Sequence, residues 1–130
     1  MKIRSENTIA AALLIGMMLV CTSIVCFSQT PEKLQGTWMN EQSTRKAELY
    51  KQGSKYSGKI VWIAEGEEKV KPGDIIFKDL VWDGKVFKGL AATPKQGNLP
   101  CIISFEHDKK IKITVSKGIM SRSVYWSRID

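Results

Sequence analysis

Leu34-Gln35-Gly36-Thr37-Trp38 is the stretch that decides the fold of this chain. Its counterpart near the C-terminus is Val124-Tyr125-Trp126-Ser127-Arg128. Both read as β-strands, and short strand-like segments and turns lie between them. Pairing the first and last strands of such a sheet removes both of its exposed edges. The sequence therefore predicts one small antiparallel barrel with Trp38 and Trp126 on neighbouring strands.

The region between these ends contains no helical pattern. No window of ten or more residues repeats apolar positions at the 3.6-residue spacing of a helix. Short strands at regular spacing are typical of an all-β barrel or sandwich, and their meander-like order favours a barrel. The expected strands are 34–40, 46–52, 55–64, 74–82, 85–92, 99–106, 110–116 and 120–129.

Two local patterns give further expectations. Asp83-Gly84 predicts a hairpin with a type I′ turn, in which both central residues have positive φ. In the expected strand 55–64, simple alternation places Ile60 and Trp62 on one face, and Val61 and Ile63 on the other.

The N-terminal segment predicts export. Lys2 and Arg4 precede a nearly continuous apolar run from 9 to 27, and Ser28 provides a small residue at the end of that run. This pattern is typical of a signal peptide covering residues 1–28, which would be removed before Gln29. The mature protein is then a single domain, 29–130, in the periplasm or secreted, with no transmembrane segment.

Two other interpretations of this segment stay open. Its apolar run approaches the roughly 20 residues that span a bilayer, so it could remain as an anchor. A lipoprotein would use Cys21 or Cys26, but bulky Val20 and Val25 precede these cysteines where a small residue is expected.

Composition narrows the function of the mature domain. Its 102 residues retain Cys101 alone, so no internal disulfide is available. The apolar neighbours of Cys101 predict that this cysteine is buried.

The net charge of the mature domain is positive. The whole chain carries +7, and residues 29–130 carry 18 basic against 12 acidic side chains, a net +6. A basic exported domain is expected to be attracted to anionic envelope surfaces. Nucleic acid is not expected, because no stacking motif is present.

No catalytic or metal constellation is apparent, so we expect neither an enzyme nor a cofactor. His107 is the single histidine and falls at an expected hairpin tip. One histidine and one buried cysteine do not make the three or four ligands of a zinc site.

Aromatic residues are the best candidates for a binding site. Trp62 and Trp82 fall near strand ends and flank the connection 65–73 together with the strand that follows it. We expect them to line a barrel mouth together with Tyr56 and Phe87, where aromatic rings grip apolar ligands or stack on sugars. The alternative is that they only complete the core.

The two ends of the chain resemble the lipocalin-like (calycin) superfamily. In that superfamily a Gly-x-Trp opens the first strand, and an arginine of the last strand covers the tryptophan. The resemblance implies that Gly36, Trp38, Trp126 and Arg128 close the barrel. A guanidinium stacks well on an indole face.

A second resemblance covers residues 34–129. Tyr56-Ser57-Gly58-Lys59-Ile60-Val61-Trp62 and Lys71-Pro72-Gly73-Asp74, with the two terminal stretches, are similar to the bacterial exported domain of unknown function 2147 family. The resemblance implies a small envelope protein with no established activity. Many relatives carry an Asp-x-x-Asn-Pro-type loop, where this chain has Lys69-Val70-Lys71-Pro72-Gly73-Asp74, so any role of that loop does not carry over.

These observations predict a non-enzymatic binding module for a small apolar or amphipathic ligand or an envelope partner. The alternative is a structural or stress-related envelope protein with a filled barrel and a basic surface. The size of the interior separates the two, because eight strands enclose either packed side chains or one small ligand.

Overall fold

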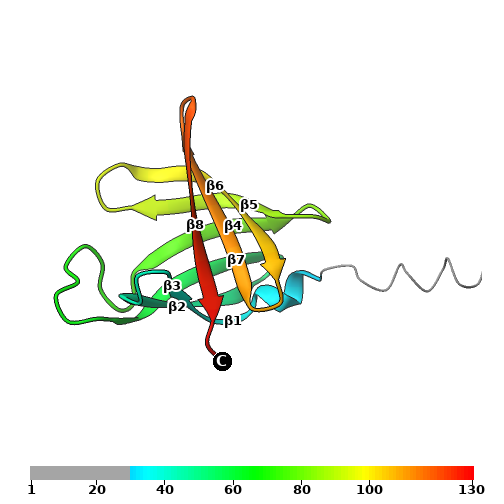
Figure 1. Cartoon of the computed structure of the whole chain (residues 1–130). Coiled ribbons are helices and arrows are strands. Elements are labelled where there is room, and N and C mark those ends of the chain that lie inside the picture. Colours follow the sequence, from blue (N-terminus) through cyan, green and yellow to red (C-terminus); the bar gives the residue numbers. More distant parts are fainter. Residues whose placement is uncertain (1–29) are drawn as a thin grey trace, which may run out of the picture.

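The computed structural model describes residues 30–130, so the predicted signal peptide lies outside the described residues. Each strand pairs antiparallel with the next, and the last pairs with the first, which closes the barrel (Figure 1). The predicted eight-stranded meander barrel is confirmed. Its elements are the 3₁₀ helix η2 (Pro31–Leu34) and strands β1 (Gly36–Asn40), β2 (Arg45–Gln52), β3 (Lys55–Ile63), β4 (Ile75–Trp82), β5 (Phe87–Thr93), β6 (Gly97–His107), β7 (Lys110–Lys117) and β8 (Met120–Arg128).

The entry to β1 differs from the prediction. Leu34 was expected to begin the first strand, but it ends η2, a helix that starts with Pro31 in the first turn. Proline suits this position because its fixed φ matches a helix and its missing N–H needs no partner there. Within residues 30–130, no helix is long and apolar enough to cross a membrane.

Because successive strands are antiparallel, the connections alternate between the two ends of the barrel. We call one end the closed end, because η2 covers it together with the connections 53–54, 83–86 and 108–109. The other end, which we call the open end, carries the connections 41–44, 64–74, 94–96 and 118–119.

The core fills the barrel from the closed end to its middle. Leu34, Trp38 and Phe87 are fully buried, and each comes from a different part of the chain. Alternation along the strands sends every second side chain inward, so all eight strands contribute to one core. The largest fully buried side chains are Trp38, Phe87, Leu34, Leu49, Ile60, Leu80, Ile103, Ile111 and Ile113.

A β-bulge in β3 overturns the predicted faces of that strand. Ala47 lies opposite Ile60, whereas Lys46 lies opposite Trp62, so Val61 is an extra residue in the pairing. One extra residue reverses the faces of all residues after it. Trp62 is therefore 39% exposed on the outside, while Ile63 packs against the core.

The Asp83-Gly84 turn is a wider connection than predicted. Trp82 pairs with Phe87, so four residues join β4 to β5. Gly84 has a positive φ of 99° but Asp83 does not, which excludes type I′. The carboxylate of Asp83 accepts hydrogen bonds from the backbone N–H groups of Lys85 and Val86 at 2.9 Å each, an Asx turn that stabilises the longer loop.

Candidate ligand-binding site at the open end of the barrel

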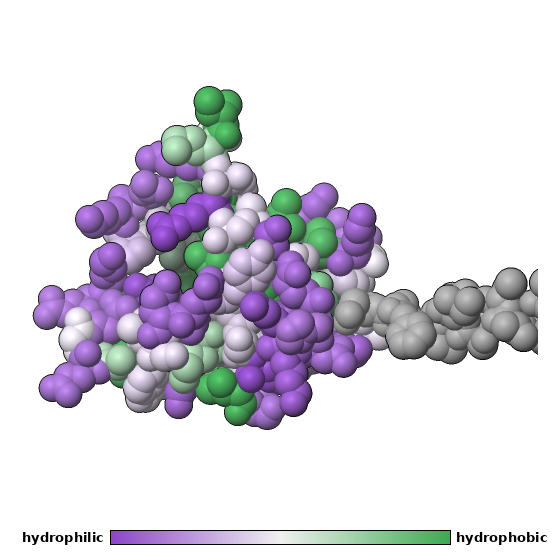
Figure 2. Space-filling model, in the orientation of Figure 1, coloured by the Kyte–Doolittle hydropathy of each residue, from purple (hydrophilic) through white to green (hydrophobic). Residues whose placement is uncertain are grey.

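The interior of the barrel is not filled at the open end. Two adjoining pockets of about 430 and 560 Å³ share Arg45, Arg122 and Val124 among their walls, and we call them together the open-end hollow. Figure 2 shows this hollow beside the β7–β8 hairpin, with apolar atoms lying behind a hydrophilic rim. Pockets of several hundred cubic ångströms are the size that small-molecule ligands occupy.

Three neighbouring strands supply the apolar wall of the hollow. Leu99 of β6, Val115 of β7 and Val124 of β8 all line it. They face inward because each lies two residues, or a multiple of two, from a buried residue of its own strand. Deeper along β8, Trp126 is buried at the boundary with the filled core and packs edge-to-face on Phe77, with ring centroids 6.2 Å apart.

The rim of the hollow is charged, with cations in excess. Its basic side chains come from β2, β7, β8 and the 64–74 connection, whereas both of its carboxylates belong to connections at the open end. Glu41 is engaged by β8, since its Oε1 accepts the backbone N–H of Tyr125 at 2.9 Å. The charged residues lining the hollow are Arg45, Lys69, Lys117 and Arg122 against Glu41 and Glu67.

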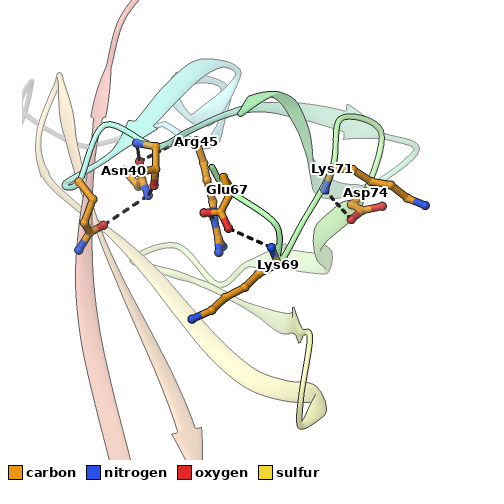
Figure 3. Close-up of polar contacts among 8 residues, drawn as sticks. Asn40, Arg45, Glu67, Lys69, Lys71 and Asp74 are labelled. Atoms are coloured by element: carbon orange, nitrogen blue, oxygen red, sulfur yellow. Dashed lines mark hydrogen bonds and ion pairs between the residues drawn. The ribbon is translucent and has the colours of Figure 1, made fainter. Parts of the chain in front are cut away.

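An ion pair ties the long 64–74 connection to the barrel rim. Arg45 Nε donates to Glu67 Oε2 at 2.9 Å, and the backbone N–H of Lys69 donates to Glu67 Oε1 at 3.0 Å. In Figure 3 the side chains of Arg45 and Glu67 point toward one another between β2 and the loop. These two hydrogen bonds lower the pKa of the Glu67 carboxyl, so it is ionised at neutral pH.

Strand β8, which flanks β1 on the other side from β2, offers a cation without such a partner. Arg122 on β8 lines both pockets, and no ion pair within residues 30–130 involves its guanidinium. A guanidinium over an apolar wall is well placed to bind a carboxylate or phosphate in two hydrogen bonds. The hollow therefore combines an apolar interior with a cationic rim.

Three of the four predicted aromatic candidates lie together, but at the closed end. Tyr56 and Phe87 are buried with ring centroids 5.2 Å apart, and Trp82 packs on Phe87 at 4.8 Å. Phe105 completes this cluster at 6.1 Å from Trp82. These rings fill the core, and burial raises the pKa of the Tyr56 phenol.

Trp62 lies apart from that cluster. It is near the open end but faces outward, where Lys46 Nζ sits 4.8 Å from the ring centroid. Trp62 and Trp82 are thus at opposite ends of the barrel, and the mouth predicted from them is wrong. The physical reasons are the antiparallel direction of β4, which carries Trp82 away from the open end, and the bulge at Val61.

The four residues expected to close the barrel lie along β1 and β8. Trp38 pairs with Arg128, and Asn40 pairs with Trp126. Gly36 is next to the guanidinium of Arg128, which a Cβ at position 36 would strike. Gly36, Trp38 and Arg128 seal the closed end, whereas Trp126 lies deeper in the barrel and borders the open-end hollow.

The residues that form the hollow were not identified from the sequence. The available signal was alternation along β8, where Arg122, Val124 and Trp126 share the inward face. Arg45 carries the same signal on β2, two residues before buried Ala47. A basic residue at an inward position near a strand end marks the rim of a barrel.

Other reactive groups lie outside the hollow. His107 is exposed at the closed end, where its Nδ1 accepts the backbone N–H of Lys109 at 3.2 Å. Cys101 is buried in β6, and desolvation raises the pKa of its thiol to about 11. In the part of the chain described, no three or more His, Cys, Asp or Glu side chains gather as metal ligands would.

Comparison with known proteins supports the fold. The barrel is similar to the solved structure of protein HP1028 from the human pathogen Helicobacter pylori, described as belonging to the lipocalin family. The TM-score is 0.61 at 16% sequence identity, over 75% of this chain and 83% of that one. The chain thus has a lipocalin-like fold. No family model and no curated protein matches it, so membership of the domain of unknown function 2147 family stays a prediction.

Proposed function

We propose that this protein is an exported, non-enzymatic binding protein that takes one small amphipathic ligand with an anionic head into the open-end hollow. The observation that carries the proposal is the contrast between the two halves of the barrel. The closed half is packed, whereas the open half leaves a hollow of several hundred cubic ångströms. Export to the periplasm or beyond follows from the N-terminal segment and belongs to the same proposal.

The chemistry of the walls specifies the ligand class. An apolar chain or ring would pack against Leu99, Val115 and Val124, where burial of apolar surface favours binding. An anionic head would meet Arg122, and Arg45 lines the same two pockets. A neutral apolar ligand would leave Arg122 without a counter-charge, so the amphipathic anion is the better fit.

Calorimetric titration with decanoate and decanol tests the proposal. We expect saturable one-to-one binding of decanoate, and a loss of at least tenfold in Arg122→Gln with little change for decanol. Lys85→Gln removes the same charge from an exposed turn at the closed end and is the matched control. Val124→Trp places an indole where the two pockets meet, and it should abolish binding of both ligands.

Two results would reject this function. One is the absence of saturable binding of either compound to the unmodified protein. The other is a decanoate affinity of the folded Val124→Trp variant equal to that of the unmodified protein, which would place the ligand outside the hollow. The alternative function, a structural or stress-related envelope protein with a basic surface, is favoured by the packing that extends from the closed end to the middle of the barrel.

A further inference from the structure

The β7–β8 hairpin ends in an exposed apolar apex. Lys117 pairs with Met120, so Gly118 and Ile119 alone form the turn. Gly118 has a φ of 62° and Ile119 does not have a positive φ, as in the type II′ turns of two-residue hairpins. This geometry puts Ile119 at the tip, where it is as exposed as in an extended chain, and Met120 is 75% exposed.

The hairpin projects beyond its neighbours. In Figure 1 its apex extends past the other turns of the barrel, and in Figure 2 the atoms at the top of this projection are coloured as strongly hydrophobic. Burial of Ile119 contributes nothing to the stability of the fold, and burial of Met120 contributes little, because most of their apolar surface is exposed. Their apolar surface is available to an external partner.

The charge of the hairpin indicates the kind of partner. Residues 109–129 contain no aspartate or glutamate. Lys117 and Arg122 flank the apex on its two strands. Lys95 is exposed in the 94–96 connection, on the same side of the barrel, since Thr93 and Gln96 line the hollow together with Lys117. The remaining cations of this segment are Lys109, Lys110, Lys112 and Arg128.

We propose that the apex at Ile119 and Met120 inserts into the interface of an anionic phospholipid bilayer, with Lys117, Arg122 and Lys95 at the headgroups. Shallow insertion of apolar side chains combined with attraction of basic side chains to anionic lipid is sufficient for reversible membrane binding. A protein partner is less suited, because stable protein interfaces bury about 800 Å² on each side, and a two-residue tip offers far less.

This orientation has a consequence for the hollow. Lys117, Met120 and Arg122 also line the open-end hollow, so the inserted apex would hold the mouth of the barrel against the membrane. The inference concerns the apex alone and does not depend on a ligand being bound.

Vesicle flotation tests the apex directly. Residues 30–130 suffice for the experiment, because the closed barrel and its core lie entirely within them. With vesicles of phosphatidylcholine and phosphatidylglycerol we expect the partition coefficient to fall about tenfold in Ile119→Ser and to rise in Ile119→Trp, since tryptophan favours the membrane interface. The control Ile102→Ser removes a 41% exposed isoleucine from the barrel wall, and it should change the partition coefficient less than twofold.

The outcomes decide between insertion and its alternatives. Equal flotation of the unmodified protein and Ile119→Ser would overturn the proposal, and so would equal binding to vesicles of phosphatidylcholine alone and to anionic ones. Self-association that Ile119→Ser abolishes, without vesicle binding, would assign the apex to a second copy of the chain. Because Ile119 does not line the hollow, decanoate binding by the same variant reports separately on the proposed function.

Discussion

The guanidinium of Arg128 lies 4.5 Å from the centroid of the Trp38 ring, and the two residues face each other across the β1–β8 pair. Arg128 Nη1 donates to the carbonyl of Gln35 at 2.9 Å, and Nη2 donates to that of Lys33. Trp38 Nε1 donates to the carbonyl of Leu34 at 3.0 Å. One side chain from each end of the sequence thus holds η2 across the closed end.

Arg128→Ala should lower the free energy of unfolding by about 2–4 kcal/mol, because it removes the stacked cation and leaves carbonyls at the closed end without their donor. Denaturant unfolding followed by tryptophan fluorescence measures the change. Arg128→Lys should restore only part of it, since an ammonium does not reproduce the planar fork. Arg122→Ala is the control and should cost less than about 0.5 kcal/mol; equal losses would refute the role of Arg128.

Gly89→Ala should destabilise the barrel by about 1–3 kcal/mol. A Cβ at position 89 would lie 2.7 Å from the carbonyl oxygen of Lys78 and 2.8 Å from that of Asp79, and this backbone cannot yield cheaply. The contact arises at the irregular pairing of β4, where Asp79 has a positive φ of 56°. Thermal melting measures the effect, with exposed Lys88→Ala as the neighbouring control.

Asp79→Gly should raise the stability by up to about 1 kcal/mol, the opposite direction to Gly89→Ala. Asp79 adopts a left-handed conformation that glycine adopts without steric cost. The same melting experiment applies. A loss of stability would mean that the Asp79 side chain contributes more than its backbone conformation costs.

Stability should fall at alkaline pH through Cys101. Burial raises the pKa of its thiol from 9.0 to about 11, so the folded state keeps a proton that the unfolded state loses. The stabilisation is complete below pH 9 and is lost as the pH rises toward 11, by roughly 2 kcal/mol. The measurement is the difference between the unmodified protein and Cys101→Ala in urea unfolding at each pH. Parallel curves for the two proteins would contradict the prediction.

The 64–74 connection should loosen in acid. The hydrogen bonds from Arg45 and Lys69 lower the pKa of Glu67, so their support is present above the ordinary glutamate pKa, near 4.3, and is lost as the pH falls through the lowered value. The NMR resonances of the Lys69 amide and the Arg45 Nε–H report the release. Glu67→Gln should weaken the ion pair at neutral pH, whereas exposed Glu65→Gln should leave both resonances unchanged.

The architecture could be predicted from local patterns because strands, turns and their alternation depend on neighbouring residues. All eight expected strands begin within two residues of those found, as for the predicted 110–116 against Lys110–Lys117. The first strand begins two residues later than expected, since Leu34 belongs to η2. Closure followed from the physical need to pair the outer edges of the sheet.

The candidate site could not be predicted in the same way. A single bulge at Val61 turned Trp62 outward, and no local signal distinguishes a bulge from regular alternation. The antiparallel course of the chain then separated Trp62 from Trp82 by the length of the barrel.

The sequence by itself determined an all-β chain whose first and last strands close a barrel, because the period-two pattern and the turn residues act over a few positions. Only the tertiary structure decided that the interior is filled near Phe87 and hollow near Arg122. Packing depends on which inward side chains from distant strands reach the same level, and that register is set by bulges and by closure of the sheet.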